Sequence, residues 1–140
     1  MGRIALGVVA CAGALVSVAA PAQAERGPDG HLYGAMALSG AMEDGWSIGT
    51  AFNYPDQASA DADARDECAK EGAPRCVVVV RAVDGCAAIS RRDDIHAVGT
   101  GATRAEAERN AIAALGPGHP PSLSSEGSGP AVISHSACNG

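Results

Sequence analysis

The stretch Trp46-Ser47-Ile48-Gly49-Thr50 recurs as His96-Ala97-Val98-Gly99-Thr100, about 50 residues further along the chain. A second pair of segments is related in the same way, since Met36-Ala37-Leu38-Ser39 recurs as Ala87-Ala88-Ile89-Ser90. Similarity at a fixed spacing indicates an internal repeat, and a repeat must be recognised before any fold is assigned. The fold prediction is therefore built on two copies of one unit.

A helical segment follows each pair of strands, over residues 56–68 in the first copy and 103–115 in the second. Asp56 and Thr103 are suitable N-cap residues, and Thr103 with Glu106 has the spacing of a capping box. Apolar residues recur at every fourth position, which predicts one narrow stripe that packs close to a sheet. The stripe consists of Ala60, Ala64 and Cys68 in the first copy, and of Ala107, Ala111 and Leu115 in the second.

Each copy closes on a β-branched run that ends at or near a cysteine. Residues 77–80 are four consecutive valines, which predict a strand buried on both faces or nearly so. Residues 131–138 close the second copy. Both halves thus have the order strand, strand, helix, strand. We predict an α+β domain over residues 33–140, in which a tandem ββαβ duplication (33–84 and 85–140) forms a mainly antiparallel sheet with two short helices.

Residues 1–24 predict a secretory signal peptide that is cleaved before Glu25. One charge, Arg3, precedes an apolar run, and Ala22-Gln23-Ala24 has the small residues of a cleavage site. The run is shorter than the ~20 residues of a spanning helix, and the sequence around Cys11 only loosely resembles a lipobox. We expect an extracellular or cell-envelope protein with no membrane span after cleavage, beginning with a polar lead-in over residues 25–32.

Composition limits both the partners and the core. The 140 residues carry 16 acidic and 10 basic side chains, a net charge of −6, which argues against nucleic-acid binding. Hydrophobic residues make up 46% of the chain, but nearly half of them are alanines. An alanine methyl contributes much less to burial than a leucine side chain. A core this thin requires another source of stability.

Four cysteines outside the signal peptide meet that requirement: Cys68, Cys76, Cys86 and Cys138. An even number in an exported chain predicts two disulfides, with three connectivities to choose from. We favour Cys68–Cys76 and Cys86–Cys138. By the chain-entropy model, the second bridge, which closes the longer loop, should contribute about 4 kcal/mol to the free energy of unfolding. No C-x₂-C pair occurs, so we expect neither a zinc site nor a redox role. No metal or cofactor is predicted.

Candidate catalytic groups are few. Asp93, Asp94 and His96 lie together and include acid–base side chains. We favour a polar hairpin turn followed by a strand residue, because catalytic groups normally come from several elements. The alternative is a secreted hydrolase that uses His96 with Asp93 or Asp94. In Ser134-His135-Ser136, neighbouring side chains of a strand point to opposite faces, and no G-x-S-x-G elbow is present.

Gly99-Thr100-Gly101 joins a strand to a helix, as in a phosphate-binding loop. The segment lacks both the third glycine of the dinucleotide motif and the Gly-Lys pair of a P-loop. Its counterpart Gly49-Thr50 indicates a structural role, and anion binding beside Arg104 is the alternative. No catalytic residue is predicted, and we expect a protein that is not an enzyme.

The aromatic residues are concentrated in the first half, where all four occur: Tyr33, Trp46, Phe52 and Tyr54. Aromatic side chains anchor protein interfaces, so Trp46, Phe52 and Tyr54 are the predicted partner-binding residues. The alternative is that they fill core space that alanines leave. Residues 117–130 are rich in Pro, Gly and Ser and predict a flexible surface loop. A rigid loop at this place would instead favour an enzyme inhibitor.

Six segments share their order and spacing with a known family. They are Tyr33-Gly34-Ala35-Met36-Ala37, Trp46-Ser47-Ile48-Gly49, Cys76-Val77-Val78-Val79, Cys86-Ala87-Ala88-Ile89, Thr103-Arg104-Ala105-Glu106-Ala107-Glu108 and Ser136-Ala137-Cys138-Asn139. Through these segments the chain resembles the family known as domain of unknown function 4189. The family usually has Cys-Gly-Ala where this chain has Cys86-Ala87-Ala88, and the proline-rich insertion is a second departure. The resemblance covers residues 33–139.

The resemblance implies a small exported protein of the kind abundant in actinobacteria, including mycobacteria, with no established catalytic residues. Some relatives are regarded as host-directed effectors. We therefore expect a disulfide-stabilised module that binds a protein partner and faces the envelope or a host.

Overall fold

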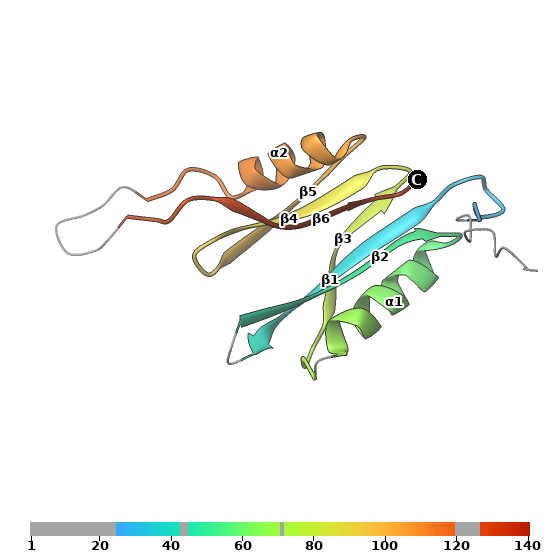
Figure 1. Ribbon diagram of the computed structural model, residues 1–140, viewed down its shortest axis with the longest axis horizontal. Coiled ribbons are helices and arrows are strands. Elements are labelled where there is room, and N and C mark those ends of the chain that lie inside the picture. Colours follow the sequence, from blue (N-terminus) through green and yellow to red (C-terminus); the bar gives the residue numbers. More distant parts are fainter. Residues whose placement is uncertain (1–24, 43–44, 71, 120–126) are drawn as a thin grey trace, which may run out of the picture.

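The computed structural model describes residues 25–42, 45–70, 72–119 and 127–140 (Figure 1). The predicted signal peptide, residues 1–24, and the central part of the predicted flexible loop, residues 120–126, lie outside the described residues. On either side of the latter, the His119 backbone N–H donates to Ser128 Oγ at 2.7 Å, and the Ser128 N–H donates to the His119 carbonyl at 3.1 Å.

The two halves have the same order of elements. The first half contains β1 (Tyr33–Met42), β2 (Gly45–Tyr54), α1 (Gln57–Ala69) and β3 (Val77–Val83). The second contains β4 (Cys86–Arg92), β5 (Ile95–Gly101), α2 (Arg104–Ala114) and β6 (Val132–Cys138). The α+β class and the order strand, strand, helix, strand are confirmed.

The strands form two sheets, where the sequence analysis expected one. Each half builds its own antiparallel sheet, with the orders β2-β1-β3 and β5-β4-β6. The sheets stack face to face, and α1 and α2 lie on the two outer sides, giving four layers (Figure 1). The reason is that one helix covers only one face of its sheet. The larger apolar side chains on the other face are buried only against the second sheet.

Each helix packs very closely on its sheet. The buried helical positions are Ala60, Ala64 and Cys68 in α1, as predicted, and Ala107 and Ala111 in α2. The third predicted member of the second stripe, Leu115, is only half-buried, because α2 ends at Ala114 and Leu115 is its C-cap. A glycine faces each stripe. A Cβ atom at Gly49 would lie 1.9 Å from the Ala64 carbonyl oxygen, and one at Gly99 would lie 2.2 Å from the Ala111 nitrogen. Only glycine permits these approaches.

In each half a serine hydroxyl ties the helix to a strand, although the two serines lie on different strands of their halves. Ser47 Oγ donates to the Cys68 carbonyl at 2.6 Å, and Ser90 Oγ donates to the Ala111 carbonyl at 2.6 Å. These carbonyls lie in the last part of each helix, where some carbonyls lack partners within the helix. The hydroxyls therefore fix the helices at the depth that the glycines allow.

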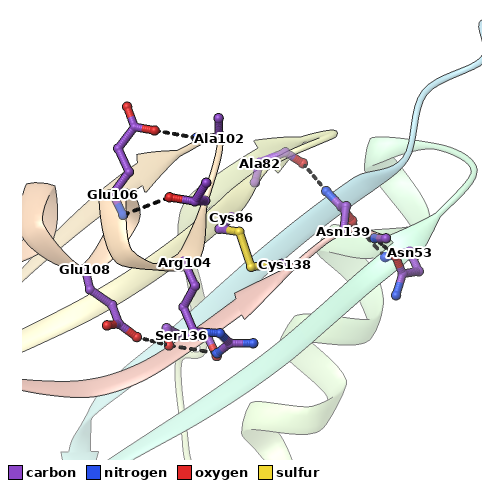
Figure 2. The surroundings of a disulfide bond; sticks show 12 residues. Asn53, Ala82, Cys86, Ala102, Arg104, Glu106, Glu108, Ser136, Cys138 and Asn139 are labelled. Atoms are coloured by element: carbon purple, nitrogen blue, oxygen red, sulfur yellow. Dashed lines mark hydrogen bonds between the residues drawn. A yellow bond between two sulfur atoms is a disulfide. The ribbon is translucent and has the colours of Figure 1, made fainter.

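The helix starts agree with the predicted caps. The Ser59 backbone N–H donates to the Asp56 carboxylate at 2.8 Å, and the Glu106 N–H donates to Thr103 Oγ1 at 3.2 Å. The Glu106 carboxylate accepts from the Ala102 N–H at 3.0 Å, one residue before the position of a standard capping box (Figure 2).

The layer between the sheets contains the larger side chains. Its buried members are Met36, Val80, Ala82, Ala87 and Ile89, with Phe52, Ile48, Val79, Val98 and Ala137 packed against them. The predicted burial of the valine run is wrong at its start. Because β3 is an edge strand, Val77 is 60% exposed.

Both predicted disulfides are confirmed. Cys68–Cys76 joins the end of α1 to the segment before β3, and Cys86–Cys138 joins β4 to the directly opposite residue of β6. Asn139 follows the second bridge and closes this end of the sandwich (Figure 2). Its side chain donates to the Ala82 carbonyl at 3.1 Å and accepts from the Asn53 N–H at 2.8 Å.

The lead-in, residues 25–32, is held against the turn between the halves. Asp84 accepts from the Leu32 N–H at 2.9 Å and from Arg26 at 3.1 Å, and its second oxygen lies 2.5 Å from His31 Nδ1. Leu32 is buried.

Removal of the disulfides tests their unequal contributions. The bridges close loops of 52 and 8 residues, so the chain-entropy model gives about 4 kcal/mol for Cys86–Cys138 and roughly 2.5 kcal/mol for Cys68–Cys76. We expect C86A/C138A to lower the free energy of unfolding more than C68A/C76A in urea titrations. The reverse order would contradict the assignment of the longer bridge as the main covalent support.

Candidate functional site

A cleft of about 360 Å³ lies between the two sheets, at the end where the hairpins turn. The sheets diverge toward this end and converge toward the C-terminus (Figure 1). Four strands, β2, β4, β5 and β6, contribute to the walls. The lining residues are Gly45, Trp46, Ile48, Arg91, His96 and Ser134.

Trp46 lines the side of the cleft that β2 contributes. The indole is 41% exposed and lies over Gly40 of β1, where a Cβ atom would be 2.3 Å from the ring. Its ring centroid is 3.9 Å from that of His96, with the planes inclined at 56°. Trp46 and His96 are matching positions of the two predicted repeats. The positions that match in sequence therefore meet across the space between the sheets.

Burial lowers the pKa of the His96 imidazole below the usual value, the Arg91 charge lowers it further, and Asp94 opposes both effects. The net shift favours the neutral form of the ring. The Nδ1 atom is buried and has no hydrogen-bond partner among the described residues. A buried N–H without a partner is costlier than a buried acceptor without one, so the proton belongs on Nε2.

The structure separates the three predicted partner-binding residues. Trp46 lines the cleft, whereas Phe52 packs in the layer between the sheets against Gly34. Tyr54 lies on the opposite face of its sheet and packs beside α1. Its hydroxyl donates to Asp63 at 2.6 Å, a bond that raises the pKa of Tyr54 to about 12. Only Trp46 of the three faces the cleft.

A β-bulge explains the position of Tyr54. Asn53 has a φ of 67°, and the pairing of β1 with β2 shifts register between Tyr33 and Ala35. The extra residue turns Tyr54 toward the helix, although strand alternation would place it on the same face as Phe52. Sequence alternation alone gives no signal for this change.

The predicted acid–base residues do not form a hydrogen-bonded group. Asp93 lies in the β4–β5 turn with a φ of 51° and accepts from the Gly129 N–H at 3.2 Å. Neither Asp93 nor Asp94 bonds to His96 Nδ1, which has no described partner. Ser134 lines the cleft, while Ser136 on the other side donates to Glu108 at 2.6 Å and accepts from Arg104 at 2.9 Å (Figure 2).

The start of α2, where anion binding was the alternative to a structural role, already contains a carboxylate. Glu106 accepts the Ala102 N–H, and Arg104 donates to Ser136 rather than facing an open site. A second hollow, of about 500 Å³, lies on the outer side between α2 and β6. It is lined by Ala105, Glu108, Arg109, Ile112, Ala113 and Ile133. Its carboxylate, Glu108, is bonded to Ser136.

Among the residues that the structure describes, no three His, Cys, Asp or Glu side chains are grouped to hold a metal ion. The described part of the chain also contains no helix long and apolar enough to cross a membrane.

Sequence reasoning missed Arg91 and Ser134 as members of the site. Both belong to strands of the second half, and their proximity to Trp46 depends on how the sheets stack. One signal was present in the predicted repeat, because Trp46 and His96 occupy matching positions in the two similar segments of sequence.

The fold defines a class of small α+β sandwich held by two disulfides, with a cleft between its sheets and an exposed tryptophan at that cleft. A family model described as "Domain of unknown function (DUF4189)" matches residues 33–138, and the chain belongs to this family.

Similar proteins occur in mycobacteria. Protein Rv1269c of Mycobacterium tuberculosis and Protein Mb1300c of Mycobacterium bovis are each 34% identical over 88 residues, which is 63% of this chain and 64% of each relative. The match thus spans less than two thirds of the relatives' length. The NMR structure of Rv1813c from Mycobacterium tuberculosis has a TM-score of 0.51 at 22% identity, covers 99% of this chain and 97% of its own, and shares the fold.

The histidines offer a test of the site's electrostatics. His31, hydrogen-bonded to Asp84, has a raised pKa, whereas burial lowers that of His96. In an NMR titration we expect His31 to titrate above, and His96 below, the usual value of about 6.5. The contribution of His96 to stability is intact above about pH 6.5 and is lost as the pH falls through its folded pKa. That of His31 is present at low pH and is lost as the pH rises through its folded pKa.

Asp84→Asn provides the control for this titration. The substitution should move the pKa of His31 back toward its usual value and leave that of His96 unchanged. A His96 that titrates at or above the usual value would contradict its burial against Trp46.

Proposed function

We propose that the protein is an exported, non-catalytic module that acts by binding a protein partner through the end of the sandwich that contains Trp46. The observation that carries the proposal is the 41% exposure of this indole at the cleft. A partly exposed tryptophan beside a hollow is the kind of residue that anchors protein interfaces.

Other exposed apolar side chains support this surface. Val77 pairs with Leu38 near the start of β3, Val132 pairs with Arg91, and Ile95 pairs with Arg92. All three lie at the hairpin end and are 60%, 41% and 57% exposed. Val83, also exposed, lies at the opposite end, where it pairs with Tyr33. Concentration of apolar side chains at one end marks an interaction surface.

Export accords with the covalent structure. Disulfides persist in oxidising compartments, and the predicted signal peptide would deliver the chain to one. We infer that the two halves arose by duplication, with Trp46 in the first half and His96 at the matching position of the second. The envelope or a host is the expected setting of the partner.

A binding role accounts for the site better than hydrolysis does. His96 would need a carboxylate to orient it or a nucleophile to activate, and its Nδ1 atom has neither among the described residues. The alternative of an enzyme inhibitor depends on a rigid loop over residues 117–130. It does not account for the exposed Trp46 at the hairpin end of the sandwich. We therefore place the function at Trp46.

Capture experiments test the proposed surface. The oxidised protein is immobilised and exposed to envelope extracts and to culture medium, alongside the variants Trp46→Ala and Val83→Ala. Val83 is the matched control, because it is an exposed apolar side chain at the other end. Partners retained by the wild type should also bind Val83→Ala and be lost with Trp46→Ala. Equal recovery by Trp46→Ala would refute the proposal.

A further inference from the structure

We propose that the cleft between the sheets recognises a carboxylate that adjoins an aromatic or large apolar group on the partner chain. This inference rests on the proposed function and specifies the chemistry of the segment that is bound.

The two walls of the cleft differ in chemistry. β2 contributes the apolar side chains Trp46 and Ile48, whereas β4, β5 and β6 contribute Arg91, His96 and Ser134. An indole wall packs against a ring or a large aliphatic side chain. The opposite wall consists of hydrogen-bonding groups. A ligand that satisfies both walls has an apolar side and a polar side.

The polar wall favours an anion. Arg91 is the charged member of the described lining, and no described carboxylate lies within ion-pair distance of it. A guanidinium donates two parallel hydrogen bonds to a carboxylate. A cation at this position is notable in a chain with a net charge of −6.

His96 and Ser134 add donors to that wall. With Nδ1 buried and without a partner, Nε2 carries the proton and acts as a donor. The Ser134 hydroxyl is exposed on β6 and donates or accepts as required. One cation and two neutral donors match the single charge of a carboxylate. A phosphate dianion is normally bound by more than one cation or by backbone N–H groups at a helix start.

The size of the cleft limits what it holds. A volume of about 360 Å³ is at the small end of ligand sites. It accommodates one side chain with an adjoining carboxylate and does not enclose a long segment. Two sources have this chemistry, the C-terminus of a chain that ends in an aromatic residue and an acidic side chain beside one.

The fluorescence of Trp46 reports binding directly, because it is the single tryptophan of the chain. Three probes are titrated into the oxidised full-length protein: N-acetylphenylalanine, its neutral amide N-acetylphenylalaninamide, and N-acetyl-aspartyl-phenylalaninamide. The proposal predicts a saturable change with at least one carboxylate probe and none with the neutral amide. Binding of the first identifies a C-terminal carboxylate as the source, and binding of the third alone identifies an acidic side chain.

Arg91→Gln and Arg65→Gln separate local from general charge effects. Both remove one positive charge, but Arg65 lies exposed on α1, remote from the cleft. Because Arg91 would make a charge-assisted hydrogen bond, Arg91→Gln should lower the affinity for the carboxylate probe roughly tenfold or more. Arg65→Gln should leave that affinity unchanged. Chemical shifts of the backbone amides show that each variant is folded.

Three results would overturn the inference: equal binding of the acid and the neutral amide, equal weakening by the two arginine variants, or no saturable response to any probe. Failure of the inference differs from failure of the proposed function. If a natural partner requires Trp46 but still binds Arg91→Gln, the proposed binding surface stands and the inference of carboxylate recognition is refuted.

Discussion

The close approach of each helix to the backbone of its own sheet is the constraint on which the rest of this structure depends. Gly49 and Gly99 face the helices at places where a single added carbon would lie within 2.2 Å of helix backbone atoms. Most of the buried side chains are alanines, and these are useful as a core only when backbones lie close together. The glycines therefore make an alanine-rich sequence capable of folding.

The site follows from this arrangement. Because the helices occupy the outer faces, the inner faces must bury each other, and the larger side chains such as Met36 and Ile89 lie between them. At one end Asn139, which follows the Cys86–Cys138 bridge of the second sheet, holds the halves together through Asn53 and Ala82. At the other end the sheets diverge, and Trp46 and His96 meet beside an open cleft. The closed end provides rigidity, and the open end provides the binding surface.

Local features were predictable from the sequence, whereas features that depend on stacking were not. Asp56 and Thr103 specify their helix starts through their own side chains, and the small-residue stripes specify the packing faces of the helices. The expected helix end at Cys68 and the expected strand after Cys76 favoured the correct disulfide pairing. By contrast, no local pattern states whether two ββαβ units share one sheet or form two. The exposure of Val77, the partial burial of Phe52 and the membership of Arg91 in the site all depend on that choice.

The most direct test of the account is the unfolding free energy of Gly49→Ala. The added methyl would lie 1.9 Å from the Ala64 carbonyl oxygen, so α1 must shift away from its sheet, at a cost of about 1–3 kcal/mol. Gly118→Ala is the control, because its nearest contact is an ordinary 3.4 Å to Ser128 Cβ. The account predicts that urea unfolding detects a loss of this size for Gly49→Ala and little change for Gly118→Ala. Equal stability of the two variants would show that the close approach of helix and sheet is not what supports the fold.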